Sequence, residues 1–438
     1  MDGTTGQGTL TLITDNPLVG VGGTETLGVQ FANTKHALIV QFDGTATSSG
    51  SMDLQTLPST LSGGYAFTLS GVDPSYFPVV AGGIFSISGT NMQNGLYDLD
   101  DAGSVTLATP FTGTISAPDS FGRGTITGTG IAVTFNYYIV GPEAIRIIDV
   151  DVSDSVVGSA FSQGAGAFSN ASLGSSVFGV EANSFGFVYA AAGMFTTVPG
   201  SGTFQGVADD AEEGVIFGGP NSGTYSIASN GYGNLTITPG DLGDISALGI
   251  YMTDPNLNLN DPNNTTSGLG GALVADLDTF LNGTGVLTPQ TDTSTASFAG
   301  NYAFGAQDFW GCNGVCEFDL VGQGSVTSGV LTGTGLLSDP FFAFGASATN
   351  SGATFSGTAT PDGSNVGRYT MIPFDIAAVA GSPFGFTVVI YQASGAQLFW
   401  VDLDSDFLSL GSFQQQGSLS GLPAVRINGA KPKAKRKP

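Results

Sequence analysis

Aspartates separated by a single residue recur three times along the chain, each time directly after an apolar run. Residues two apart on a β-strand point to the same face, so each pair could present two carboxylates to a hard cation such as Ca²⁺. Carbonyl groups of the glycine-containing loop that follows would add further ligands. In the alternative, the aspartates end a strand and begin an Asx turn. The predicted metal ligands are Asp149, Asp151, Asp276, Asp278, Asp402 and Asp404.

The sequence offers little else that could carry catalysis. His36 is the only histidine, so a catalytic triad would depend on it, and we expect a surface side chain instead. A nucleophile elbow, a zinc-protease helix and a phosphate-binding loop are all absent from the sequence. Paired carboxylates serve glycosidases, but a pair that recurs in every repeat favours a structural role. The sequence therefore predicts no catalytic residue and no enzyme.

Two cysteines, Cys312 and Cys316, lie close together in the segment WGCNGVCEF. Thiols at this spacing can close a small disulfide loop across a turn. Free thiols are one alternative. Half of a metal site is another, although the sequence has no second cysteine pair. We expect the disulfide.

Two arginines and two acidic clusters occupy matching places in different parts of the chain. Arg123 and Arg368 follow glycines at nearly equivalent turns, and in so acidic a chain each is expected to pair with a carboxylate. The clusters at 98–101 and 209–213 are expected to be solvated loop acids.

An internal repeat explains these coincidences. One pattern occurs four times: an apolar run, an aspartate, a loop with glycine and then a glutamine. A glycine-flanked turn precedes each run, and three copies open further upstream on an aromatic strand. The aligned aspartates are Asp43, Asp149, Asp276 and Asp402, and the glutamines are Gln55, Gln163, Gln290 and Gln415. The first copy begins at the glycine turn, so it holds only the second half of a unit.

Short runs rich in Thr, Val, Ile, Phe and Tyr alternate with Gly, Asn, Asp, Ser and Pro clusters, which predicts an all-β fold without significant helix. We expect tandem antiparallel barrels or sandwiches of about eight to ten strands, because closed or stacked sheets hide strand edges. The predicted segments are 1–57 (half a unit), 58–164, 165–293 (with an Asx- and Pro-rich insertion), 294–421 (with the Cys pair) and an irregular basic tail, 422–438.

Charge and composition indicate where such a protein works. Only 10% of residues are charged, and acids outnumber bases 35 to 10, so the surface repels nucleic acid and anionic membranes. No run approaches the roughly 18–20 apolar residues of a membrane helix. The start, MDGTTGQGTLTL, is no signal peptide. Because the first unit is half a unit, we expect the natural protein to extend further upstream and an extracellular or cell-surface location.

The pattern YAF…SGT…GRGT…apolar strand–Asp…Gly…Gln resembles uncharacterised tandem β-repeat proteins of the acidobacterial type, over residues 1 to about 421. The second full unit departs from this pattern, with SVFGV in place of YAF and GYG in place of GRG. The resemblance implies secretion and a non-catalytic repeat array, and it brings no catalytic residues.

Several functions remain compatible with the sequence. The first is a non-catalytic surface protein for adhesion or matrix structure, which associates with itself or with a surface polymer. The second is a module that binds an apolar small molecule or a glycan inside a barrel or cleft. A secreted hydrolase and an outer-membrane barrel are remote alternatives. A packed unit interior would favour the first function, and an open aromatic-lined cavity the second.

Overall fold

The computed structural model describes most of the chain. The described residues are 1–57, 60–129, 133–151, 154–184, 187–198, 200–212, 215–243, 245–263, 270–279, 281–311, 315–341, 347–377, 384–404 and 407–422. Cys312 and the predicted basic tail from 423 onward lie outside them.

Three closed eight-stranded antiparallel barrels follow one another along the chain, which confirms the predicted all-β fold and selects barrels over sandwiches. Each strand pairs with its neighbours in sequence, and the last strand of each barrel pairs with the first. Barrel 1 contains β5 (Gly63–Val72), β6 (Pro78–Ser88), β7 (Asn91–Asp101), β8 (Ser104–Ile115), β9 (Arg123–Thr129), β10 (Thr134–Gly141), β11 (Ala144–Asp149) and β12 (Ser155–Ser162).

The other two barrels repeat this up-and-down order. Barrel 2 contains β13 (Ser176–Ser184), β14 (Phe187–Val198), β15 (Thr203–Glu212), β16 (Val215–Ile227), β17 (Tyr232–Ile237), β18 (Ala247–Met252), β19 (Ala272–Asp276) and β20 (Asn282–Pro289). Barrel 3 contains β21 (Gly300–Gly311), β22 (Val315–Thr327), β23 (Val330–Ser338), β24 (Thr349–Pro361), β25 (Arg368–Ala377), β26 (Phe384–Ser394), β27 (Gln397–Asp402) and β28 (Phe407–Gln415). Two short 3₁₀ turns, η1 (Asn170–Ser172) and η2 (Thr295–Ser297), precede these barrels.

The N-terminal segment forms an open sheet of four antiparallel strands rather than a barrel. Its strands are β1 (Gln7–Ile13), β2 (Thr24–Asn33), β3 (His36–Gln41) and β4 (Ser49–Asp53), paired in that order. They correspond to the last four strands of a barrel, as the repeat in the sequence predicts.

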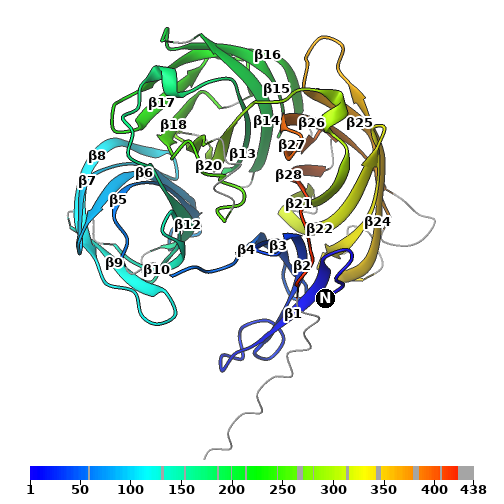
Figure 1. Cartoon of the computed structure of the whole chain (residues 1–438), viewed down its shortest axis with the longest axis horizontal. Coiled ribbons are helices and arrows are strands. Elements are labelled where there is room, and N and C mark those ends of the chain that lie inside the picture. Colours follow the sequence, from blue (N-terminus) through cyan, green and yellow to red (C-terminus); the bar gives the residue numbers. More distant parts are fainter. Residues whose placement is uncertain are drawn as a thin grey trace, which may run out of the picture.

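The three barrels and the four-stranded sheet lie around a common centre (Figure 1). The second half of barrel 2 packs on the first half of barrel 1, and the second half of barrel 3 packs on the first half of barrel 2. The four-stranded sheet packs in the same way on β21, β22 and β23 of barrel 3. The first segment of the chain therefore occupies the place after the last barrel.

The repeated glutamine makes each of these junctions. Gln55 Nε2 donates to the carbonyl oxygens of Phe121 and Ile139 at 2.9 and 2.8 Å, which joins the four-stranded sheet to barrel 1. Gln163 Nε2 donates equivalently to Asn230 O and Met252 O of barrel 2, both at 3.0 Å.

The same contact joins barrel 3 to the beginning of the chain. Gln416 Nε2 donates to Thr5 O and Phe31 O of the four-stranded sheet, at 2.9 and 2.8 Å. The sequence pattern pointed to the neighbouring Gln415, which is exposed. That assignment is wrong by one residue, because only the contact with the next unit distinguishes the two glutamines.

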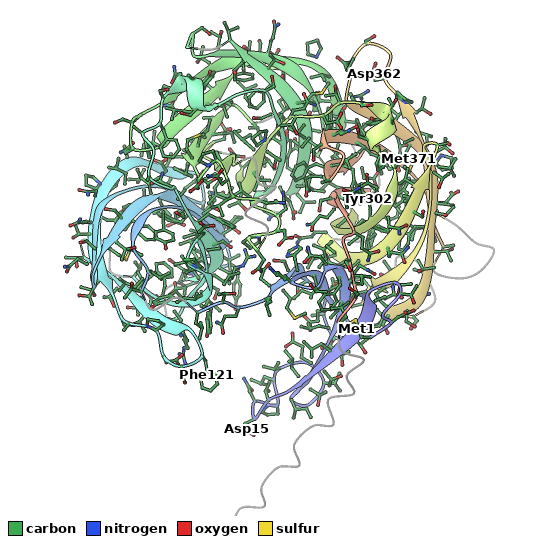
Figure 2. The ribbon with its side chains drawn as sticks, in the orientation of Figure 1. Met1, Asp15, Phe121, Tyr302, Asp362 and Met371 are labelled. Carbon is green, nitrogen blue, oxygen red and sulfur yellow. The ribbon has the colours of Figure 1, made fainter. Side chains whose placement is uncertain are left out.

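Aromatic and aliphatic side chains that alternate along each strand fill the barrels (Figure 2). The side chains that point outward form separate apolar clusters between neighbouring barrels. A strand such as β27 is therefore buried on both faces, which explains its continuous apolar run, QLFWV.

Candidate functional site

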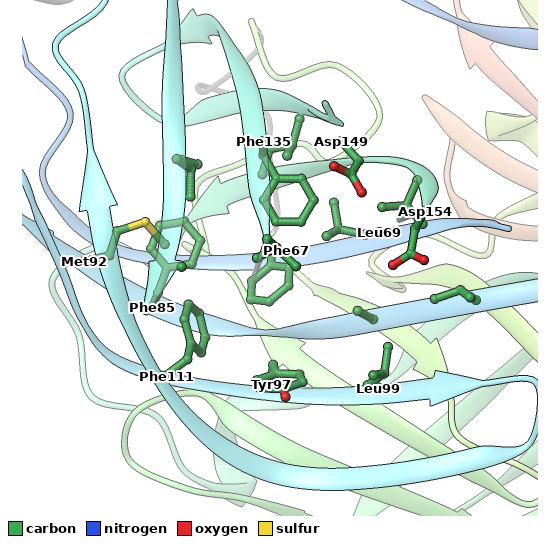
Figure 3. A pocket seen from close by; sticks show the side chains of 17 residues that line it. Phe67, Leu69, Phe85, Met92, Tyr97, Leu99, Phe111, Phe135, Asp149 and Asp154 are labelled. Atoms are coloured by element: carbon green, nitrogen blue, oxygen red, sulfur yellow. The ribbon is translucent and has the colours of Figure 1, made fainter. Parts of the chain in front are cut away.

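Barrel 1 contains an apolar cavity of about 140 Å³. Phenylalanine, leucine, valine and isoleucine side chains from strands around the whole barrel form its wall, with Met92 and Tyr97 (Figure 3). The wall includes three rings in tilted or edge-on contact, Phe67, Phe85 and Phe111, whose centroids lie 5.8 to 6.4 Å apart. These rings come from β5, β6 and β8, so the closed barrel holds them together.

Barrels 1 and 3 differ in one inward side chain that lies at this cavity. In barrel 3, Trp400 lies inside the barrel, opposite Gly411 on the next strand. A Cβ atom on Gly411 would lie only 2.2 Å from the Trp400 ring, so glycine is required there. In barrel 1 the equivalent pair is Ile147 and Gly158. The smaller Ile147 side chain lines the cavity that a tryptophan would occupy.

Two carboxylates, Asp149 and Asp154, also line this cavity, close to one another in Figure 3. Burial raises the pKa of Asp149, and the charge of Asp151 raises it further. Burial also raises the pKa of Asp154, together with the charges of Asp149 and Asp101. The wall of the cavity is thus apolar except where the carboxyl groups of Asp149 and Asp154 face it.

The three D-x-D pairs lie at the ends of β11, β19 and β27, which are the third strands of the second halves of the barrels. There they form Asx turns. The backbone N–H of the second aspartate donates to the first carboxylate, at 2.9 Å for Asp151 and 3.1 Å for Asp278 and Asp404. The second carboxylate accepts a backbone N–H of the adjacent strand, from Thr134, Ala247 and Thr387 respectively. Asp276 and Asp402 are fully buried.

These hydrogen bonds give each aspartate a structural role at the strand end. Among the described residues, the D-x-D pairs form no group of three potential ligands within bonding range of one ion. Calcium binding at these pairs remains a prediction. Cys316 is buried and disulfide-bonded, and its predicted partner, Cys312, lies outside the described residues.

His36 is buried rather than exposed, which corrects the expectation of a surface side chain. Its Nδ1 atom lies 2.8 Å from Asp53 Oδ1, and Arg146 Nη2 of barrel 1 lies 2.5 Å from Asp53 Oδ2. Burial opposes ionisation of Asp53, but the hydrogen bond from His36 and the charge of Arg146 outweigh it and lower the pKa of that carboxyl group. The His36 side chain is buried because the four-stranded sheet meets barrel 1 at this point.

The Asx- and Pro-rich insertion of barrel 2 also contacts the four-stranded sheet near His36. Asp261 Oδ2 accepts a hydrogen bond from Asn33 Nδ2 at 2.7 Å, across 228 residues of sequence. Potential ligand atoms of His36, Asp53 and Asp261 lie within 4.8 Å of one another, which makes them the best-placed metal ligands in the described part of the chain. Both oxygens of Asp53 are already bonded to His36 and Arg146, so this group supports a junction better than an ion.

The acidic clusters at 98–101 and 209–213 contain buried strand residues, not the solvated loop acids that the sequence suggested. Asp98 is fully buried and accepts hydrogen bonds from Tyr232 and Tyr251 of barrel 2, at 2.6 and 2.7 Å. A Cβ atom on Gly82, opposite Asp98, would lie 2.1 Å from the Tyr251 ring. Glycine at position 82 therefore lets Tyr251 lie flat on barrel 1.

Asp209 occupies the equivalent place between barrels 2 and 3. Arg368 Nε and Nη2 donate to its two oxygens at 2.8 Å, and the Tyr391 hydroxyl donates to Oδ2. The expected pairing of Arg368 with a carboxylate is thus confirmed. Arg123 is exposed and forms no ion pair among the described residues, so the same expectation is wrong for it.

No family model matches this chain, and no curated protein does. Two similar solved structures are crystal structures of mutants of the vaccine antigen transferrin binding protein B from Haemophilus parasuis. The first covers 90% of this chain and 86% of its own, with 11% identity and a TM-score of 0.25. The second covers 87% and 83%, with 10% identity and a TM-score of 0.24. At these TM-scores the similarity supports no conclusion about this chain. Among the described residues, no helix is long and apolar enough to cross a membrane.

Proposed function

We propose that this protein is a non-catalytic extracellular or cell-surface binding protein that takes a small apolar ligand inside barrel 1. The observation that carries the proposal is the apolar, aromatic-lined cavity of about 140 Å³. An engineered protein cavity of about 150 Å³ with a similar lining binds benzene. The expected ligand is therefore a single ring or a short alkyl chain.

The carboxylates of Asp149 and Asp154 refine the ligand class. Their raised pKa values show that negative charge is unfavourable where they stand. An ammonium group on the ligand would relieve that cost and form a charge-assisted hydrogen bond. A glycan fits less well, because the wall offers few partners for its hydroxyl groups beyond these two carboxylates and Tyr97. We therefore expect an apolar amine to bind better than the neutral hydrocarbon of the same size.

Barrel 3 supports a second role for the rest of the molecule. Its interior contains fully buried large rings, among them Trp400, Phe355 and Phe374. Such a packed interior suits a structural unit, and the disulfide at Cys316 suits an oxidising, extracellular setting. We therefore assign ligand binding to barrel 1 and a structural role at a surface or in a matrix to the remaining array.

The test compares benzylamine and toluene as ligands of the full chain and of the variant Ile147→Trp. A ligand that binds only the folded state raises stability, by about 2.7 kcal/mol at 100 times its Kd. We expect both compounds to raise Tm in the wild type, benzylamine more strongly. Ile147→Trp should remove both effects, because the ring would fill the cavity as Trp400 fills barrel 3.

Two control variants make this experiment decisive. Ile148→Trp places the same ring on the same strand but on the outer face, where Ile148 is 40% exposed, and it should leave binding intact. Asp154→Asn should weaken benzylamine about tenfold, the loss of one charged hydrogen bond, and leave toluene unchanged. Failure of both compounds to bind the wild type, or equal binding to Ile147→Trp, would contradict the proposal.

A further inference from the structure

Every unit presents one cross-strand pair of side chains toward the preceding unit. The pair stands on the first two strands of each second half-barrel, in identical register. The four pairs are Gln7–Gln30, Arg123–Tyr138, Tyr232–Tyr251 and Arg368–Tyr391.

Two of these pairs hydrogen-bond an aspartate on the third strand of the preceding barrel. Tyr232–Tyr251 donates to Asp98, and Arg368–Tyr391 donates to Asp209. The uncharged Gln7–Gln30 pair belongs to the sheet that packs on barrel 3, where the equivalent residue is Leu336. Leu336 packs with Val40 of this sheet in an apolar cluster. The Tyr–Tyr pair and the Arg–Tyr pair therefore each hold an aspartate, whereas the barrel on which the glutamine-bearing sheet packs has a leucine at that place.

The fourth pair, Arg123–Tyr138, has no such partner among the described residues. Tyr138 is 41% exposed, whereas Tyr251 and Tyr391 are fully buried. On the same face, Ile148 and Val157 stand opposite each other and are 40% and 55% exposed. The Ile148 equivalent in barrel 3, Val401, is fully buried against barrel 2. Barrel 1 thus exposes the face that the other units bury.

The four-stranded sheet is incomplete on the same side. β1 pairs only with β2 and β4 only with β3 among the described residues, so both outer edges carry free backbone groups. In the barrels, the equivalent edges pair with the first four strands of the same unit. Leu12 and Ile13 on β1 are 39% and 76% exposed. Such long open edges readily accept further strands.

From these two observations we infer that the space between β1, β4 and barrel 1 is a docking site for a four-stranded half-unit of this same repeat. The half-unit pairs with both open edges and closes a fourth barrel. Its third strand carries an aspartate that Arg123 and Tyr138 hold, as Arg368 and Tyr391 hold Asp209.

The first half of barrel 2 is the matched probe, because its Asp209 already serves an Arg–Tyr pair. In the natural chain, Asn230 directly precedes Gly231, and Thr5 directly precedes the equivalent Gly6. Residues 165–230 are therefore fused directly ahead of Gly6, in place of residues 1–5. In a second arm, the polypeptide 165–230 is added to the unmodified full chain.

We expect the fusion to remain monomeric, to protect the amides of β1 and β4 from hydrogen exchange at least tenfold, and to shield Tyr138 from iodination. In the fusion, Asp209→Asn in the grafted segment or Arg123→Glu in barrel 1 should expose Tyr138 again. Lys35→Glu changes the charge equally at the turn between β2 and β3, outside the Arg123–Tyr138 pair, and it should have no effect. If the added polypeptide 165–230 binds the full chain and Arg123→Glu weakens that binding, a separate polypeptide is sufficient to fill the site. If Tyr138 is shielded only in the fusion, the half-unit must be covalently linked to Gly6.

Two results would overturn the inference. One is a fusion that folds, by circular dichroism and cooperative melting, yet leaves Tyr138 as reactive as in the natural chain. The other is a natural chain that dimerises through β1 or β4 and buries Tyr138 unaided, because the occupant would then be a second copy. If the fusion does not fold, the second arm decides: no binding at millimolar polypeptide rejects the site.

Discussion

At the scale of single residues, buried carboxylates between barrels are the most consequential side chains. Asp98 combines complete burial with hydrogen bonds from two phenols and from the backbone N–H of Ala108, the last at 2.7 Å. A buried carboxylate is tolerated only with such compensation. Burial and the neighbouring Asp98 charge together raise the pKa of Tyr251 well above its usual value, so this phenol remains a donor.

We predict that Asp98→Ala lowers the free energy of unfolding by about 3 kcal/mol, because it leaves the buried hydroxyl group of Tyr251 and the partly buried one of Tyr232 without their acceptor. Asp101→Ala is the matched control, since Asp101 ends the same strand but is exposed. Urea unfolding monitored by circular dichroism measures both. Equal effects of the two variants would show that the Asp98 junction contributes little.

The carboxylate of Asp154 gives a prediction about pH. Its pKa in the folded protein lies above the ordinary value of 3.8, because of burial and neighbouring aspartates. The native state then binds more protons than the unfolded state, so this group costs stability as the pH rises through that range. Asp154→Asn should therefore raise Tm near pH 7 and leave it almost unchanged near pH 3. A Tm that falls at neutral pH would contradict the assignment.

At the scale of strands, successive side chains point alternately into the barrel and away from it. β19 and β27 each send alternate residues into their own barrel and toward a neighbouring barrel, so both of their faces are apolar and buried. Barrels 1 and 3 differ in the size of one inward residue, Ile147 against Trp400, and Ile147 lines the cavity of barrel 1. A strand prediction alone does not show whether the remaining side chains fill a barrel.

At the scale of the whole molecule, the ring closes because the C-terminal barrel holds the N-terminal sheet. Gln416 Nε2 bonds two carbonyl groups there, and the next residue, Gly417, donates its N–H to Ala32 O at 2.8 Å. Thr56 donates to Val140 O of barrel 1 in the same manner, at 2.7 Å. The last junction therefore repeats the first, although no peptide bond enforces it.

We predict that Gln416→Ala loosens the four-stranded sheet while leaving the barrels intact. Thr5 O and Phe31 O then keep only their second donor, Gln30 Nε2, which lies 2.7 and 3.4 Å from them, so the cost is that of the lost hydrogen bonds, about 0.5–1.5 kcal/mol. Amide hydrogen exchange should accelerate up to about tenfold in β1 and β2 and stay unchanged in β13 to β20. Gln415→Ala, at the adjacent exposed position, is the control. Uniform acceleration along the chain would mean that the ring unfolds as one unit.

The sequence by itself determined the all-β class, the repeat and the half-unit at the start, because strand periodicity and turn residues are local properties. It also located the D-x-D turns, whose hydrogen bonds join residues close in sequence or on neighbouring strands. It misjudged Asp98 and Asp209, because their hydrogen-bond partners lie on another barrel. It also misjudged His36, which bonds Asp53 where Arg146 of barrel 1 meets that carboxylate.

Only the tertiary structure decided which acids are buried and which glutamine makes the last junction. Both depend on which surfaces meet when the units close into a ring, and burial cannot be read from one strand. The two chemically similar arginines show this most clearly. Arg368 holds a buried carboxylate and Arg123 stands exposed, because a neighbouring barrel covers one and not the other.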